Sequence, residues 1–175
     1  MKNGKNLILI GFMGTGKTAV GKRLAGILNM DFFDTDQEIE KVTGMSVTRL
    51  FYKHGEIRFR SEEALMIHKL TNKKNSIIAT GGGIVLNSEN INLLKNTGYL
   101  VCLTAKPEVI FERVKRRNNR PLLRKDDTYE TIITLLQERE ELYQCADFTV
   151  DTSDMDFEEI INKILKFLSE QKANN

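Results

Sequence analysis

The stretch that decides the fold is Gly11–Thr18, GFMGTGKT, which directly follows the apolar run NLILI at Asn6–Ile10. It satisfies the pattern GxxxxGK[ST], and apolar residues at helical spacing begin just after it, so the motif stands between an expected strand and an expected helix. Its glycines allow backbone N–H groups to surround an anion, and the helix start directs its positive dipole end at the same anion. The stretch therefore predicts a loop that binds nucleotide phosphates.

Two side chains add to this prediction. Lys17 supplies a full positive charge, and Thr18 offers a hydroxyl oxygen to Mg²⁺, a hard ion that prefers oxygen ligands. The alternative is a glycine-rich turn that happens to precede a lysine. From average residue frequencies, such a match arises by chance in about one chain in a hundred.

Short apolar runs alternate along the chain with longer segments of helical period, which is the pattern of crossover connections between parallel strands. Helical stripes are expected at Val20, Leu24, Ile27 and Leu28, and again from Phe157 to Leu168. We predict an α/β fold of the P-loop NTP hydrolase type, a three-layer sandwich forming a single domain over residues 1–175. Its five parallel strands are expected at Asn6–Ile10, Asp31–Phe33, Ser76–Ala79, Tyr99–Leu103 and Phe148–Val150.

Composition indicates an ordinary soluble protein. The 175 residues include 26 basic and 24 acidic side chains, so the small net charge of +2 gives no support to nucleic-acid binding. The basic and apolar N-terminus is too short for a membrane span and lacks a cleavage pattern, so a buried strand explains it better than a signal peptide. Cys102 and Cys145 have neither the number nor the spacing of a disulfide framework. A cytoplasmic location is the expectation.

Two carboxylates, Asp34 and Asp36, follow the second expected strand, at the edge where open α/β sheets collect ligands. A phosphate loop needs one carboxylate for Mg²⁺ and another for an acceptor hydroxyl, and Asp34 suits the metal while Asp36 suits the hydroxyl. The alternative is a capping box formed by Thr35 and Glu38, which explains the threonine but not both acids.

The segment FRSEE places Phe59, Arg60 and Glu63 on one helix face, where the Arg60–Glu63 pair could equally be an unimportant surface ion pair. Thr80 then leads into three consecutive glycines, Gly81, Gly82 and Gly83. Close approach of the backbone to a ligand is a sufficient reason for three such residues, and a flexible connection is the alternative.

A helix expected over Asp127–Tyr143 carries Arg139 on its apolar stripe. Arg139 either grips an anion, as a carboxylate clamp would, or extends past the core to solvent or to a neighbouring glutamate. Before this helix, the basic run Lys115–Lys125 suggests a mobile lid over about residues 114–126 that covers phosphates. A solvated charge run or an RNA-binding patch is the alternative, although no aromatic residue lies between its arginines.

Taken in this order, GFMGTGKT, DTD, FRSEE, TGGG, the basic run and Arg139 resemble the shikimate kinases, members of the nucleoside-monophosphate-kinase-like P-loop group. The resemblance covers nearly the whole chain. It implies ATP-dependent phosphorylation of the 3-hydroxyl of shikimate to shikimate 3-phosphate, in the chorismate route to aromatic amino acids. It also implies Mg²⁺ as the cofactor, ATP, ADP and shikimate as the partners, and a monomer that binds neither nucleic acid nor a membrane.

The resemblance also implies roles for individual residues. The catalytic residues would be Lys17, Asp36 and Arg120, and the Mg²⁺ ligands would be Thr18 directly and Asp34 through water. Shikimate would be held by Asp36, Arg60, Gly81, Gly82, Gly83 and Arg139, with Phe59 and Glu63 in support. ATP would be held by Gly14, Thr15, Gly16, Lys17, Thr18, Ala19, Arg116, Arg117, Arg120 and Asp154.

Two segments match the family pattern less closely. The stretch between Lys115 and Arg120 is short, so either Arg116 or Arg117 would stack on adenine. The segment VDTSDMD resembles the adenine loop only loosely, which bears on Asp154.

Two other functions compete with this interpretation. One is another small-molecule kinase of the same fold, acting on gluconate or a nucleoside monophosphate. A carboxylate-bearing acceptor with vicinal hydroxyls explains two arginines and an aspartate better than a nucleotide acceptor does. The other is a non-catalytic nucleotide-binding switch, suggested only by Asn72–Asn75, NKKN, which lacks the aspartate of a guanine-reading motif.

Overall fold

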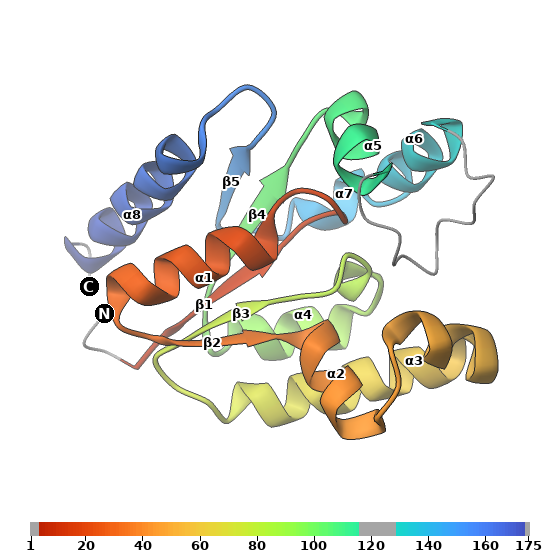
Figure 1. Cartoon of the computed structure of the whole chain (residues 1–175). Helices are drawn as coiled ribbons and strands as arrows, with labels where there is room; N and C mark the ends of the chain where they lie inside the picture. Colours follow the sequence, from red (N-terminus) through yellow and green to blue (C-terminus); the bar gives the residue numbers. More distant parts are fainter. Residues whose placement is uncertain (1–3, 116–128, 174–175) are drawn as a thin grey trace.

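The computed structural model describes residues 4–115 and 129–173. As predicted, its described residues contain one parallel sheet of five strands; their order is β2-β3-β1-β4-β5 (Figure 1). The expected strand positions are correct to within one residue at each end. The bounds are β1 Asn6–Ile10, β2 Asp31–Asp34, β3 Ser76–Ala79, β4 Gly98–Thr104 and β5 Phe148–Asp151.

Alternation along β1 explains the three layers. Leu7 and Leu9 pack with α1 (Lys17–Leu28) and α8 (Phe157–Ala173), whereas Ile8 and Ile10 belong to a second core cluster on the opposite face. Because successive side chains of a strand point to opposite faces, a strand buried on both sides must be apolar throughout.

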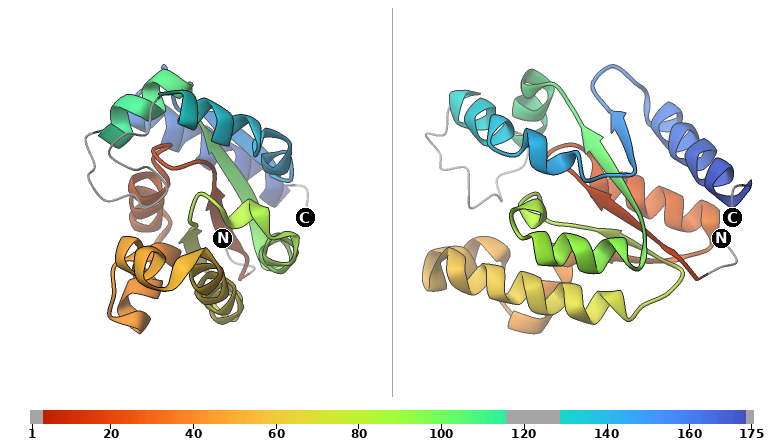
Figure 2. Two further views of the ribbon diagram at one scale, coloured as in Figure 1. Left: turned by 90° about the vertical axis from the view of Figure 1, so that its right-hand side faces the viewer. Right: turned by 180° about the vertical axis from the view of Figure 1, so that it is seen from behind.

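The opposite face carries α4 (Ser88–Lys95), against which part of α3 (Val47–Thr71) packs (Figure 2). The other elements are α2 Thr35–Thr43, η1 Ile84–Leu86, α5 Pro107–Lys115, α6 Tyr129–Gln137 and α7 Glu140–Tyr143. The prediction of two apolar helix faces is wrong for two of their residues, since Ile27 is 44% exposed and Phe157 is 42% exposed. Ile27 lies at the edge of the buried face of α1, and Phe157 is the first residue of α8.

The carboxyl ends of the strands position the site. The phosphate loop follows β1, Asp34 ends β2, and the glycine triplet follows β3. Helices α2 and α3 flank this edge on one side, and α5, α6 and α7 flank it on the other (Figure 1). Functional side chains from distant parts of the sequence are therefore brought to one edge.

The helix expected over Asp127–Tyr143 is broken in the structure. Helix α6 ends at Gln137, and α7 begins at Glu140 after Arg139, whose φ is −115° and ψ −4°. The N–H of Arg139 donates to the carbonyl of Leu136, three residues back, which closes the last turn of α6. Arg139 is nonetheless only 4% exposed, in agreement with its expected place on the apolar stripe.

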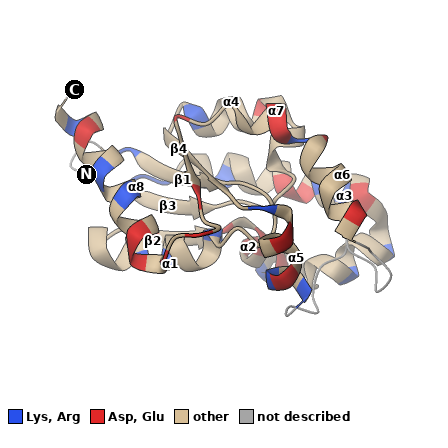
Figure 3. Cartoon of the chain, turned by 90° about the horizontal axis from the view of Figure 1, so that it is seen from above, with Lys and Arg blue, Asp and Glu red and all other residues tan. Residues whose placement is uncertain are grey.

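Lysine, arginine, aspartate and glutamate are interspersed along the described helices in Figure 3, in keeping with the small net charge. Among the helices of residues 4–115 and 129–173, none combines the length and the apolar character that crossing a membrane requires. Of the two cysteine thiols, Cys102 is buried and Cys145 half-buried, and burial raises the pKa of Cys102 to about 12.

Candidate active site

The loop between β1 and α1 lines a cleft of about 660 Å³, the phosphate cleft, together with Asp34, Asp36, Arg113 and Thr152. Gly16 stands at the N-cap of α1 with φ 99°, a conformation that glycine adopts without strain. No side chain caps the helix there, so its first N–H groups face the cleft. A helix N-terminus in this arrangement binds anions.

Lys17 lies inside the fold of the loop. Its Nζ donates to the carbonyl oxygens of Gly11 at 2.7 Å and Phe12 at 2.8 Å, and the residue is buried. These contacts hold the ammonium group beside the helix N-terminus. Its charge is therefore already in place where the phosphates of a nucleotide would lie.

The two expected metal ligands are in contact with each other. The hydroxyl of Thr18 donates to Oδ2 of Asp34 at 2.7 Å, while Oδ1 of Asp34 accepts from the N–H groups of Asp36 and Gln37. Asp34 is thus the N-cap of α2, so the alternative of a capping box formed by Thr35 and Glu38 is wrong. The buried Thr35 hydroxyl instead accepts from the N–H of Gly81 at 2.9 Å.

A second cavity, which we call the arginine pocket, adjoins the phosphate cleft. Asp36, Val47 and Gly82 line both, so a ligand in the pocket would lie beside phosphates in the cleft. Asp36 is the carboxylate at this junction. The full lining of the pocket is Met13, Asp36, Val47, Phe51, Phe59, Arg60, Glu63, Gly81, Gly82, Gly83 and Arg139.

Arg60 and Glu63 form an ion pair on the α3 side of the pocket. Nη1 of Arg60 donates to Oε2 of Glu63 at 2.8 Å, and the Glu63 side chain is 1% exposed. Burial raises the pKa of Glu63, against the opposing effect of the Arg60 charge. Burial lowers the pKa of Arg60, but Glu63 and Glu56 outweigh it and leave that pKa raised. This pair is therefore part of the pocket rather than a surface ion pair.

Arg139 enters the pocket from the opposite side. Its Nε and Nη1 are buried, and within residues 4–115 and 129–173 neither atom has a hydrogen-bond partner. The same holds for Oε1 of Glu63. Because a buried charged group without partners is costly, these atoms indicate a polar ligand that completes the pocket. Two guanidinium groups facing one small cavity fit a carboxylate.

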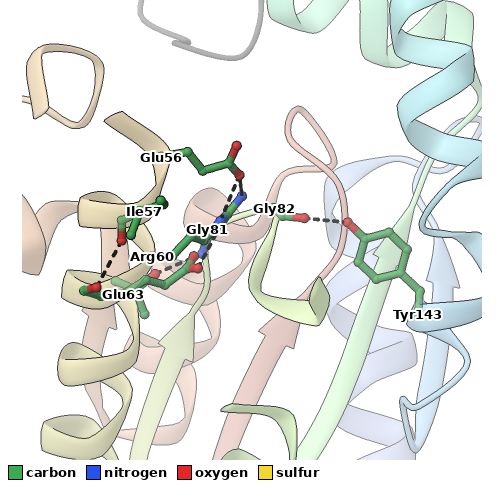
Figure 4. Close-up of polar contacts among 9 residues, drawn as sticks. Glu56, Ile57, Arg60, Glu63, Gly81, Gly82 and Tyr143 are labelled. Atoms are coloured by element: carbon green, nitrogen blue, oxygen red, sulfur yellow. Dashed lines mark hydrogen bonds and ion pairs between the residues drawn. The ribbon is translucent and has the colours of Figure 1, made fainter. Parts of the chain in front are cut away.

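The three glycines form the floor between these groups. A Cβ on Gly81 would lie 2.9 Å from both Oδ1 of Asp36 and Oε1 of Glu63, and one on Gly82 would lie 3.0 Å from the N atom of Met13. Tyr143 donates from its hydroxyl to the carbonyl of Gly82 at 2.7 Å and fixes this peptide from the far side (Figure 4). The triplet is a tightly held floor rather than a flexible connection.

Replacing Gly83 with alanine tests this packing. The new Cβ would lie 2.5 Å from Nη2 and 2.6 Å from Nη1 of Arg60, so the guanidinium must move. We expect the affinity for shikimate, the acceptor that the sequence resemblance implies, to fall about tenfold in calorimetric titrations, since a hydrogen bond to a charged group contributes about 1.5–3 kcal/mol. Stability should change little, because Gly83 has an ordinary φ of −101°.

The matched control is Gly26→Ala on α1, where a Cβ meets nothing within 4 Å. This variant should keep its shikimate affinity and gain up to about 1 kcal/mol in the free energy of unfolding. Equal shikimate affinities in the two variants would contradict the packing argument.

Sequence reasoning missed several residues of the site. Arg113, in the last turn of α5, donates from Nη1 to the Thr152 hydroxyl at 2.9 Å and from Nη2 to the Thr152 carbonyl at 2.8 Å. The Thr152 hydroxyl lies 3.3 Å from the Thr15 carbonyl, so α5 and the segment after β5 are tied to the phosphate loop. In the sequence, Arg113 was indicated only by its position next to the basic run Lys115–Lys125.

The other expected site residues fall into three groups. Arg116, Arg117 and Arg120, with nearly all of the expected lid, lie outside the described residues. Asp154 is exposed and pairs with Lys106 at 2.6 Å, and it does not line the phosphate cleft. Ala19 lines the cleft, and Phe59 lines the pocket with the Arg60 guanidinium 5.2 Å from its ring centroid.

Comparison with known proteins agrees with this geometry. The family model described as shikimate kinase matches residues 13–169. A shikimate kinase of Pelotomaculum thermopropionicum is 57% identical over 95% of this chain and 96% of its own. The structure of the Acinetobacter baumannii shikimate kinase in complex with shikimate has a TM-score of 0.93 at 36% identity, covering 98% of this chain and 96% of that one.

A gluconokinase from Sinorhizobium meliloti has a TM-score of 0.61 at 16% identity over 99% of this chain and 97% of its own, a likeness of fold alone. Substantial identity over nearly the full chain is found with shikimate kinases, and the family model spans both cavities. The chain therefore belongs to the shikimate kinase family.

Proposed function

We propose that this protein transfers the terminal phosphoryl group of ATP to the 3-hydroxyl of shikimate, giving shikimate 3-phosphate for the chorismate route. The observation that carries the proposal is the arginine pocket. Arg60 and the partly unpaired Arg139 face a small cavity that shares Asp36 with the phosphate cleft. A carboxylate at one end of the acceptor and hydroxyls at the other fit this distribution of charge.

In this proposal the phosphates lie on the N–H groups of Gly14–Ala19, with the ammonium of Lys17 beside them. Asp36 accepts a hydrogen bond from the acceptor hydroxyl, orients it and takes up its proton. Transfer is direct and in line, so the main tasks of the protein are positioning and stabilisation of charge. We expect Arg120 to add charge at the phosphates and Arg116 or Arg117 to contact adenine, with Asp154 on the adenine side.

The oxygen donors of Thr18 and Asp34 fit Mg²⁺. Their side-chain oxygens are 2.7 Å apart at the edge of the phosphate cleft, and both are hard ligands. Within the described residues no group of three or more His, Cys, Asp or Glu side chains could hold a metal by itself. Thr18 and Asp34 would therefore hold Mg²⁺ together with the nucleotide phosphates, and the ion would supply positive charge that opposes the phosphate charge.

Replacing Asp34 with asparagine tests this assignment. Asparagine keeps an oxygen that can cap α2, so the helix should remain, but the negative charge is lost. We expect the Mg²⁺ concentration for half-maximal activity to rise about tenfold, the usual size of such an outer-shell effect. The control is Asp31→Asn, the same charge change at the opposite end of β2. An unchanged Mg²⁺ requirement in Asp34→Asn would exclude Asp34 from the metal site.

An acceptor comparison tests the proposed function itself. ADP release from Mg·ATP would be followed with shikimate, gluconate, AMP or no acceptor. Of these four samples, we expect ADP release only in the one that contains shikimate. Turnover with gluconate or AMP would keep phosphoryl transfer but require another acceptor, and hydrolysis without acceptor would favour an ATPase or a switch.

We also propose that the protein works as a cytoplasmic monomer whose partners are ATP, ADP and shikimate.

A further inference from the structure

Arg60 has a second carboxylate partner outside the pocket lining. Oε1 of Glu56 accepts from both Nε at 3.2 Å and Nη2 at 3.1 Å, while Glu63 accepts from Nη1 (Figure 4). A single oxygen of Glu56 thus engages two donors. Those donors form one of the two edges through which a guanidinium makes paired hydrogen bonds with a carboxylate.

The other edge of this guanidinium is obstructed. Nη1 is engaged by Glu63, and both Nη atoms lie so close to Gly83 that a Cβ there would meet them. An incoming carboxylate that is to form paired hydrogen bonds with Arg60 therefore needs the Nε–Nη2 edge. That edge is the one that Glu56 holds.

Of the two glutamates that bind Arg60, Glu56 is the one that an incoming carboxylate can displace. Its side chain is 52% exposed, against 1% for Glu63, so it can regain water when it leaves Arg60. It follows Gly55, where α3 is kinked with φ 81° and ψ 172°. Exposed ion pairs four residues apart on a helix are weak, so displacement requires little free energy.

We propose that Glu56 is an internal competitor for the acceptor carboxylate: it occupies the Nε–Nη2 edge of Arg60 until the acceptor carboxylate displaces it. The inference rests on the proposed function, which supplies that carboxylate. Glu56 thereby lowers the affinity of the pocket for a carboxylate. A neutral ligand that leaves the contact between Glu56 and Arg60 in place does not meet this competition.

The test compares Glu56→Gln with Glu62→Gln. Glu62 pairs with Arg58 at the same spacing on the same helix and does not line the arginine pocket, so its variant matches the change in net charge. Calorimetry would measure the Kd of each protein for shikimate and for its neutral methyl ester. We expect Glu56→Gln to bind shikimate roughly two- to fivefold more tightly, the range that exposed ion pairs contribute, with the ester unaffected. Glu62→Gln should match the unchanged protein.

The other outcomes overturn the inference in distinct ways. Weaker shikimate binding by Glu56→Gln would make Glu56 a positioning residue for Arg60, and an equal Kd would mean that it does not compete. An equal gain for the ester would mean that the acceptor charge is not involved. If the unchanged protein fails to bind shikimate, the proposed function fails and this inference with it. If it binds and Glu56→Gln is no tighter, only this inference fails.

Discussion

Replacing Lys17 with alanine is expected to lower kcat by about a thousandfold. The ammonium group is held between the carbonyls of Gly11 and Phe12, beside the N-terminus of α1. Its charge therefore stands ready before a nucleotide binds and opposes the charge that spreads over the transferring phosphoryl group. The measurement is the steady-state rate of ADP formation at saturating Mg·ATP and shikimate.

A control is needed because the substitution also removes hydrogen bonds from two buried carbonyls. Thermal melting and calorimetric binding of shikimate would establish that the fold and the arginine pocket persist in Lys17→Ala. Near-normal turnover in a folded Lys17→Ala variant would contradict the phosphate-loop mechanism.

Arg139→Ala is expected to raise the Kd for shikimate about 30-fold or more while leaving the Kd for ATP within about twofold. Truncating one partner of a buried charge pair costs about 2 kcal/mol or more, which sets the lower bound. Arg139 lines the arginine pocket but not the phosphate cleft, so the loss should fall on one ligand. Titration of each ligand into the variant measures both constants.

The conservative variant Arg139→Lys sharpens the result. Lysine keeps the charge but lacks the planar fork, so it should recover only part of the lost affinity. Equal losses for ATP and shikimate in Arg139→Ala would instead indicate a general structural role for Arg139.

The sheet and the phosphate loop could be predicted because their signals are local. The spacing in Gly11–Thr18 encodes a turn and a helix start within eight residues, and a strand buried on both faces must be apolar throughout. The pairing of Arg60 with Glu63 was equally available, since residues three apart share a helix face. Residue spacing does not show that Glu63 is buried. The structure shows this burial, which makes Glu63 part of the pocket.

The rest of the site depends on contacts between distant segments. The sequence suggests that Thr35 caps a helix, yet its hydroxyl accepts a hydrogen bond from the N–H of Gly81, 46 residues away. Tyr143 reads as one residue of an apolar stripe, yet its hydroxyl holds the Gly82 carbonyl 61 residues away.

Product analysis by ³¹P and ¹H NMR directly tests whether the protein transfers phosphate from ATP to the 3-hydroxyl of shikimate. Purified protein would be incubated with Mg·ATP and shikimate, with a parallel sample lacking shikimate. We expect one new phosphate monoester, coupled to the proton on C3 of shikimate and formed in equal amount to ADP. A phosphate on another hydroxyl, or ADP accompanied only by inorganic phosphate in both samples, would contradict it.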